Sequence, residues 1–246
     1  MRCFDAGVSV LVEKPIASTV VEADEMIVTA KKNGLVFGVG HIERFNPAYR
    51  SIAHDNLKPV FIESHRLAAF NPRGTDVAVV LDLMIHDIDI VLNMVKRPVK
   101  SVQAVGVNVV SGEVDISNAR IEFEGGCVAN LTTSRISQRK MRKVRVFQKN
   151  AYVSMDFLTG ETEVFRLKPG TRPEALPGAI PQSMDGIAYL KHPNDGGNAL
   201  LIELADFIEA VKNGTAPRVT AEDGRYALEV ATLVMEGMEA SARSLE

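Results

Sequence analysis

The chain has 246 residues, of which 46% are hydrophobic and 24% charged, and its formal net charge is −3. These ordinary globular values are compatible with one large or two smaller domains, and they give no electrostatic reason to expect a nucleic-acid partner or an anionic membrane surface. Only two cysteines occur, Cys3 and Cys127, which excludes a disulfide framework and a cysteine-rich metal site. We expect no membrane span, no signal peptide and a reducing, cytoplasmic location.

The first 45 residues predict two parallel strands joined by a crossover helix. An apolar run at 8–12 is typical of a buried strand, and residues 19–33 carry a capping box followed by apolar residues at helical spacing. A second apolar run at 35–40 completes the βαβ pattern, because parallel strands need a crossover connection. This part of the chain therefore predicts an open α/β sheet.

Both of these strands end in polar residues. Glu13, Lys14 and Pro15 follow the first strand, and the polar segment 41–44 follows the second. The carboxyl ends of parallel strands meet at one edge of the sheet, which is where ligands bind in open α/β folds. A functional site is therefore expected at this edge.

Residues 46–246 predict an α+β domain with a mostly antiparallel open sheet, because a series of strands follows in hairpin order. A segment rich in proline and glycine, 169–197, is expected to be a long loop. The expected helices are 47–57, 76–95, 198–212 and 220–242. The expected strands are 60–66, 101–110, 119–124, 127–135, 143–148, 152–157 and 162–167.

The expected helix at 76–95 carries Asp82 and His86. Residues four apart lie on one helix face, where a carboxylate can orient an imidazole that acts as a general base near neutral pH. The spacing also suits two metal ligands, but no third ligand follows at helical spacing, and we expect no metal site. The plainer interpretation is a polar histidine satisfied by Asp82 at a contact between helix and sheet.

Other candidates also have plain interpretations. Lys14 could be a solvated loop charge, and His41 and Arg44 could be ordinary polar residues at a strand end. The basic segment 135–145 lacks interleaved aromatic residues, so we interpret it as a protected edge or a solvated face and not as a nucleic-acid site.

Several motifs together resemble the Gfo/Idh/MocA family of NAD(P)-dependent oxidoreductases. They lie along essentially the whole chain in the family's order: Val10-Leu11-Val12-Glu13-Lys14-Pro15, the segment 38–47, the Asp82/His86 pair, and the tail motifs 203–207 and 221–224. The segment 74–89 is most similar to members that act on UDP-N-acetylglucosamine at C3.

The resemblance implies oxidation of a sugar or sugar-nucleotide hydroxyl to a ketone, with hydride transfer to NAD or NADP. It implies that His86 is the base, that Asp82 orients it or assists proton transfer, and that Lys14 polarises the reacting oxygen. It also implies that one face of the sheet holds the substrate and that the other forms a homo-oligomer interface. The implied cofactor-binding residues are Glu13, Lys14, Pro15, His41, Arg44 and Asn46.

One departure from the family is the absence of a G-x-G-x-x-G motif, which would seat the pyrophosphate. From the length of βαβ units, roughly 70 residues of the nucleotide domain are expected to be missing, so NAD binding should be impaired. Residues 1–45 would then be the C-terminal remnant of a Rossmann domain, and 46–246 a substrate-binding and dimerisation domain. The alternative is a non-catalytic sugar-nucleotide-binding or dimerisation module. A third hypothesis is a metal-dependent lyase or isomerase built on His86.

Overall fold

The computed structural model describes residues 1–52, 56–71, 77–168 and 186–244. Two short helical segments, η1 (Ile42–Phe45, 3₁₀) and η2 (Val80–Met84, π), accompany the α-helices. The α-helices are α1 (Arg2–Asp5), α2 (Val20–Lys32), α3 (Pro47–Arg50), α4 (Ile85–Val95), α5 (Ala199–Asn213) and α6 (Ala221–Arg243). The strands are β1 (Val10–Glu13), β2 (Phe37–Gly40), β3 (Phe61–Leu67), β4 (Val99–Val107), β5 (Ile116–Phe123), β6 (Val128–Ser134), β7 (Met141–Gln148), β8 (Ala151–Asp156), β9 (Glu161–Leu167) and β10 (Ile187–His192).

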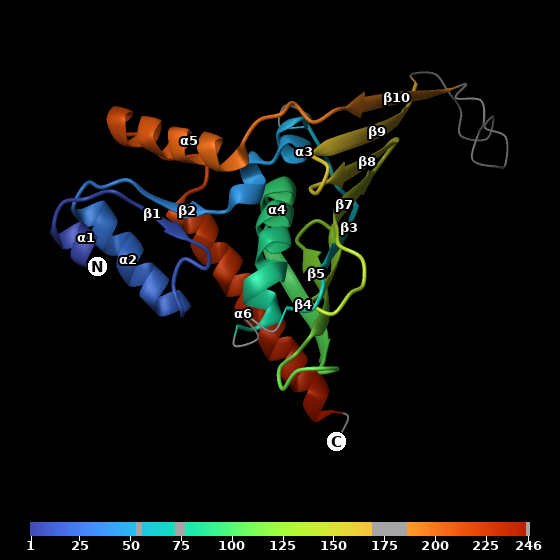
Figure 1. Cartoon of the computed structure of the whole chain (residues 1–246), viewed down its shortest axis with the longest axis horizontal. Helices are drawn as coiled ribbons and strands as arrows, with labels where there is room; N and C mark the ends of the chain where they lie inside the picture. Colours follow the sequence, from blue (N-terminus) through green and yellow to red (C-terminus); the bar gives the residue numbers. More distant parts are fainter. Residues whose placement is uncertain (53–55, 72–76, 169–185, 245–246) are drawn as a thin grey trace.

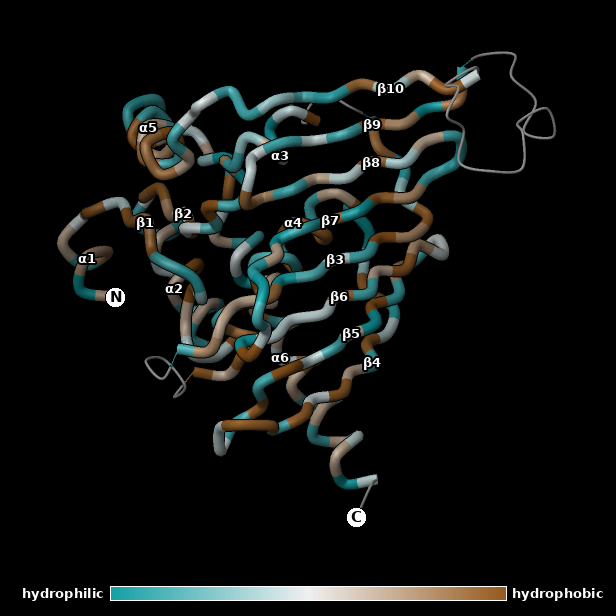
Figure 2. Tube along the Cα trace, turned by 45° about the vertical axis from the view of Figure 1, so that its right-hand side comes forward, coloured by the Kyte–Doolittle hydropathy of each residue, from teal (hydrophilic) through white to brown (hydrophobic). Residues whose placement is uncertain are grey.

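An eight-stranded sheet dominates the structure, in the order β10-β9-β8-β7-β3-β6-β5-β4 (Figure 2). Only β3 and β6 pair in parallel within it, and every other neighbouring pair is antiparallel. The prediction of an open, mostly antiparallel sheet is therefore confirmed.

Helices α4 and α6 cover one face of this sheet, which Figure 1 shows edge-on. Strand residues alternate between its two faces, and the inward set, such as Ile62, Leu131 and Val146, packs against the helices in the main hydrophobic core. Burial of each such side chain stabilises the fold by about 1.5–3 kcal/mol. Among the described elements, none of the helices packs on the opposite face of the sheet.

Strands β1 and β2 form a second, two-stranded parallel sheet, with Glu13 opposite Gly40 at the carboxyl ends. The crossover helix α2 begins with the predicted capping box of Thr19 and Glu22. This confirms the βαβ prediction. The core beneath the sheet also contains residues from the far end of the chain, among them Val219 and Leu228. The N-terminal unit is therefore completed by the C-terminal segment, and the boundary at residue 45 stays a prediction.

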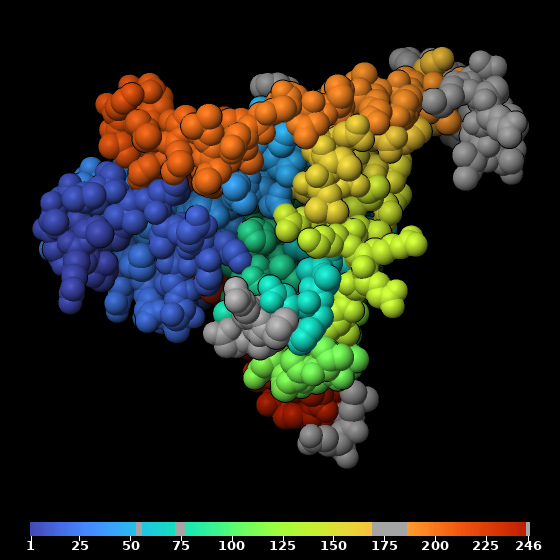
Figure 3. Space-filling model, in the orientation of Figure 1, coloured from blue at the N-terminus to red at the C-terminus, as the bar shows by residue number. Residues whose placement is uncertain are grey.

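Helix α6 joins the two cores because it passes very close to β2. A Cβ atom on Gly224 would lie 2.5 Å from a methyl carbon of Val39, so a glycine is required for this approach. An isolated antiparallel bridge between Gly38 and Thr220 fixes the same junction. Helix α5 lies along the outside of the N-terminal unit, where Figure 3 shows it in orange, and it contacts η1.

The helix expected at 47–57 is shorter in the structure, because α3 ends at Arg50. The carbonyl of Ala48 accepts hydrogen bonds of 2.8 Å from the hydroxyls of Ser51 and Thr162. These bonds compete with continuation of the helix, and the second comes from β9, far away in the sequence. Residues 53–55 lie outside the described part.

The prediction of a loop at 169–197 is wrong for residues 187–192, because these residues form β10. This strand pairs along its whole length with β9, from Ile187 opposite Leu167 to His192 opposite Thr162. The flanking prolines and glycines favoured a loop, but the open edge of β9 supplies backbone partners that local sequence does not reveal. Residues 169–185 lie outside the described part.

Both cysteines are free thiols, Cys3 at the surface and Cys127 in the core. Within the described ranges, none of the helices is both long and apolar enough to cross a bilayer. A cytoplasmic location stays a prediction.

Candidate active site

The carboxyl ends of β1 and β2 bring the first group of candidate residues together. Glu13 ends β1, and Lys14 and Pro15, which are joined by a cis peptide bond, follow it. His41 follows β2. The Glu13 carboxylate lies over Gly40, where an added Cβ would be only 2.9 Å from Oε2. These residues therefore lie at the crevice where ligands bind in open α/β sheets.

The ammonium group of Lys14 reaches from this crevice to the π-helical segment η2. Its Nζ donates to the carbonyl of Asp82 at 2.6 Å and lies 3.4 Å from the carbonyl of Leu81. The carboxylate of Asp82 is 3.6 Å away. A solvated loop charge would make no such contacts, so the plain interpretation of Lys14 is wrong.

The local helix geometry explains this contact. The N–H of Ile85 bonds to the carbonyl of Val80, five residues earlier, which is the π pattern. A π turn is wider than an α turn and commonly occurs at functional sites. Residues 80–84 were predicted as α-helix, and residue 76, the expected start, lies outside the described part. The expected α-helical spacing of Asp82 and His86 therefore does not hold.

His86 begins the regular part of α4, and the structure buries most of its ring. Burial, together with the positive charges of Arg66 and Lys14, lowers the pKa of the His86 imidazole well below its ordinary 6.5. Among the described residues Nδ1 has no hydrogen-bond partner, and no hydrogen bond joins His86 to Asp82. The imidazole is therefore neutral at neutral pH, as a proton acceptor must be, but the expected orientation by Asp82 is absent from this structure.

The environment of Lys14 has two opposing effects on its amino group. Burial lowers the pKa of Lys14 from its ordinary value, and Asp82 opposes that shift. The side chain is 19% exposed, so a ligand can still reach the nitrogen. Lys14 is thus a positive charge held by the protein at the edge of the crevice.

His41 is completely enclosed, with 1% of its surface exposed. Both ring nitrogens lack a hydrogen-bond partner among the described residues, and burial lowers the pKa of the ring. Such orphaned polar atoms are uncommon in native interiors and often mark functional sites. They set His41 apart from an ordinary polar residue at a strand end.

Arg44 and Asn46 both have protein partners in this structure. Arg44 forms a bidentate pair with Asp89, with bonds of 2.7 and 2.8 Å. The Asn46 side chain caps α3 through Ala48 and donates to Glu43. These bonds hold both side chains in place, and a direct contact of either residue with the cofactor stays a prediction.

Sequence reasoning missed the buried arginine beneath His86. Arg66 is 2% exposed, forms a bidentate pair with Asp87 and bonds to Glu43 at 2.9 Å. An inward-facing position on β3, shared with Ile62, was the signal, since a charge there requires buried partners.

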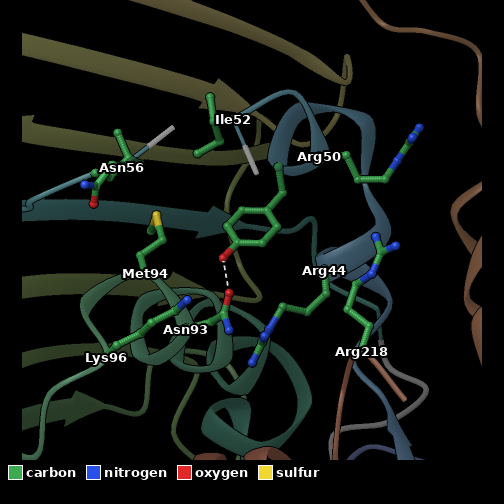
Figure 4. A pocket seen from close by; sticks show the side chains of 10 residues that line it. Arg44, Arg50, Ile52, Asn56, Asn93, Met94, Lys96 and Arg218 are labelled. Carbon is green, nitrogen blue, oxygen red and sulfur yellow. Dashed lines mark hydrogen bonds between the residues drawn. The ribbon is translucent and has the colours of Figure 1, made fainter. Parts of the chain in front are cut away.

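Several pockets with basic linings flank this region in the described part of the chain. One, of about 570 Å³, lies between α3 and the end of α4 and is lined by Arg44, Arg50, Lys96 and Arg218 (Figure 4). Another, of about 600 Å³, also includes Arg44 and Lys96. A smaller one, of about 270 Å³, adjoins Asp82. Within the described ranges, no group of three or more histidine, cysteine, aspartate or glutamate side chains is placed to hold a metal ion.

Two segments of the chain match family models of the same group of oxidoreductases. The GFO/IDH/MocA C-terminal domain matches residues 52–154, and the oxidoreductase family with an NAD-binding Rossmann fold matches residues 1–41.

Individual relatives agree with these matches. The UDP-N-acetylglucosamine 3-dehydrogenase of Acidithiobacillus ferrooxidans is 34% identical over 238 residues, which cover 96% of this chain and 73% of that enzyme. A solved structure of it matches with a TM-score of 0.88 at 33% identity and covers 97% of this chain and 74% of that one. The myo-inositol 2-dehydrogenase of Thermotoga maritima is 25% identical over 244 residues, or 93% of this chain and 70% of that enzyme.

Proposed function

Because this chain belongs to the GFO/IDH/MocA family of oxidoreductases, we propose that it oxidises the C3 hydroxyl of UDP-N-acetylglucosamine, or of a closely similar sugar nucleotide, to a ketone. The relative that is 34% identical acts on this substrate, which supports the choice. The observation that carries the proposal is the convergence of Lys14, Asp82 and His86 at the carboxyl edge of β1.

The residues at this edge fit the nicotinamide end of NAD or NADP. The Glu13 carboxylate and the neighbouring Gly40 lie at the ends of their strands, and the enclosed His41, whose ring nitrogens have no partner among the described residues, follows Gly40. No G-x-G-x-x-G motif occurs among the 246 residues, so the part of the cofactor that these residues would hold is the nicotinamide side. When bound, the cofactor supplies the hydride acceptor.

In the proposed reaction His86 accepts the proton of the sugar hydroxyl as the hydride leaves C3. Its lowered pKa keeps the imidazole neutral and ready for this task. Lys14 stabilises the negative charge that develops on the oxygen, because its ammonium is already anchored on the carbonyl of Asp82. The Asp82 side chain, 45% exposed, can contact the sugar or relay the proton to solvent.

Turnover with substitutions at the two proposed catalytic residues tests this function. The full chain is incubated with UDP-N-acetylglucosamine and NAD or NADP, and reduced cofactor and ketone product are measured together. His86→Asn and Lys14→Met should each lower the rate by about 10²–10⁴-fold, the usual contribution of such groups. Lys32→Met, at an exposed position of α2, is the matched control and should leave the rate unchanged.

Cofactor affinity separates this proposal from the alternative of a sugar-nucleotide-binding module without redox activity. Calorimetry that shows sugar-nucleotide binding with no NAD or NADP binding and no turnover would favour the module. Reduced cofactor and ketone formed in equal amounts would favour the oxidoreductase.

We also propose that the uncovered face of the large sheet forms a homo-oligomer interface. Five aromatic side chains lie opposite one another across adjacent strands on this face, with centroid distances of 4.9–5.7 Å. Two of these side chains, Phe147 and Tyr189, are exposed, and aromatic side chains that cluster at a surface are typical of interfaces. Sedimentation should show an oligomer that Phe147→Asp dissociates, and a monomer at all concentrations would contradict the proposal. The five aromatic residues on this face are Phe61, Phe147, Tyr152, Phe165 and Tyr189.

A further inference from the structure

The smaller basic pocket lies directly beside the proposed catalytic residues. Its walls come from the end of β3, from η2 and from the segment that joins β6 to β7, and Asp82 lines it. The same Asp82 contacts Lys14, so the pocket and the crevice share a wall. The charge of Arg142, which lines the pocket, also acts on His86 and lowers its pKa. A ligand that occupies the pocket can therefore extend to the reacting centre.

The pocket has an excess of positive charge. Arg135, Lys140 and Arg142 line it, against the single carboxylate of Asp82. Lys140 makes no ion pair within the described ranges. The side chain of Arg142 is 48% exposed, and its one ion pair there, with Glu43, is 3.6 Å long. The ammonium of Lys140 and the half-exposed guanidinium of Arg142 are therefore available to an anionic ligand.

The arginines of the larger pocket in Figure 4 differ from the cations of the smaller one because they form ion pairs with carboxylates. There Arg44 is paired with Asp89, Arg50 with Asp195, and Arg218 with Asp206 at 3.5 Å. These carboxylates already neutralise its arginines. Because the smaller pocket also shares Asp82 with the crevice that holds Lys14, its position favours it as the anion site for a ligand that reaches the reacting centre.

The size of the pocket limits which part of a ligand it takes. Its volume of about 270 Å³ is just below the ~300–1,000 Å³ of sites that enclose a whole drug-sized ligand. A diphosphate group fits such a space, and the sugar attached to it would then extend over Asp82 toward Lys14. Arginine and lysine are the side chains that usually bind phosphate oxygens.

We propose that Lys140 and Arg142, with Arg135 in the pocket wall, bind the diphosphate of the sugar-nucleotide substrate. This assignment rests on the proposed function and adds a binding subsite to it. The pocket thereby selects for sugars that carry a diphosphate at C1 over the free sugars, because a free sugar leaves the cations without a partner.

Calorimetry on the full chain tests the subsite with three probes: inorganic pyrophosphate, UDP-N-acetylglucosamine and free N-acetylglucosamine. Lys140→Ser and Arg142→Ser should each weaken binding of the two phosphate-bearing probes by about tenfold or more, as expected for hydrogen bonds to charged groups. Binding of the free sugar should stay the same. Arg139→Ser is the matched control, because Arg139 is the exposed neighbour of Lys140 and does not line the pocket.

The outcomes are distinct from those of the turnover test. Unchanged affinity of both variants for pyrophosphate and for the sugar nucleotide would overturn the subsite, and so would an absence of phosphate-probe binding by the parent chain. Loss of affinity in Arg139→Ser equal to that in Lys140→Ser would also overturn it, because a general surface attraction would then explain binding. If the variants behave as expected but the parent reduces no cofactor, the subsite stands and the proposed redox function fails.

Discussion

Glu203 on α5 provides the sharpest test of the electrostatics in this structure. The residue is 2% exposed, and its Oε1 has no hydrogen-bond partner among the described residues. Burial, with the nearby charges of Glu13 and Asp206, raises the pKa of the Glu203 carboxyl to about 7. Ionisation of this carboxyl therefore opposes folding.

The size and sign of the effect follow from linkage. The rise from an ordinary 4.5 to about 7 corresponds to at most about 3–4 kcal/mol, since each pKa unit is worth about 1.4 kcal/mol. The folded state holds the proton to higher pH than the unfolded chain does. The free energy of unfolding should therefore fall as the pH rises from 4.5 to 7, and the whole loss should be present above pH 7.

Urea denaturation of Glu203→Gln measures this loss. A neutral amide resembles the protonated acid, so the variant and the parent should differ little near the acid end of this range. Above it, the variant should be more stable by about 1–3 kcal/mol. Glu209→Gln, at an exposed position of the same helix, should show no such pH-dependent gain. If the stability difference between Glu203→Gln and the parent is the same at both ends of the range, the carboxyl ionises normally and the reasoning is refuted.

Three further predictions concern packing, buried charge and the proposed base. Gly224→Ala should lower stability by about 1–3 kcal/mol in thermal denaturation, because its Cβ would lie 2.5 Å from Val39, and an unchanged melting temperature would contradict the close approach. Arg66→Met should cost about 3–5 kcal/mol because it leaves the buried carboxylate of Asp87 without its guanidinium partner and removes the shortest ion pair of Glu43, whereas Arg120→Met, in an exposed pair, should cost less than about 1 kcal/mol. Equal losses in the two variants would show that the buried pair is not special. In an NMR titration, the His86 ring should stay neutral until well below pH 6.5. Because the unfolded chain binds this proton more readily than the folded state, the free energy of unfolding should fall as the pH falls below 6.5. A midpoint at or above 6.5 would show that the ring is solvated.

Local patterns were sufficient for several elements. The capping box at Thr19 begins a helix as predicted, and the helix expected at 220–242 begins with a second capping box at Thr220, because a cap is made by residues three positions apart. The hairpin order of successive runs predicted most strands of the large sheet, because two strands joined by a short turn pair in antiparallel fashion. Both signals are contained in short stretches of sequence, so no knowledge of the fold was needed to read them.

The candidate site was only partly predictable in this way. The sequence alone determined that Lys14 and His41 end neighbouring parallel strands, and that Asp82 and His86 lie on one helical segment. Only the tertiary structure decided that the Lys14 ammonium binds the carbonyl of Asp82, and that η2 widens into a π turn at that point. The hydrogen bond from Lys14 to Asp82 joins residues 68 positions apart, so it cannot be predicted from neighbours along the chain.

The sequence by itself determined the family, the βαβ unit, the antiparallel sheet and most of the residues proposed for the site. The tertiary structure alone decided where α3 ends, that β10 exists, and that Arg44 is committed to Asp89. It also decided that Lys140 and Arg142 lie in a pocket beside Asp82. The physical reason is the same in each case: burial and charge balance depend on which distant segments meet, whereas propensity and periodicity depend only on neighbours along the chain.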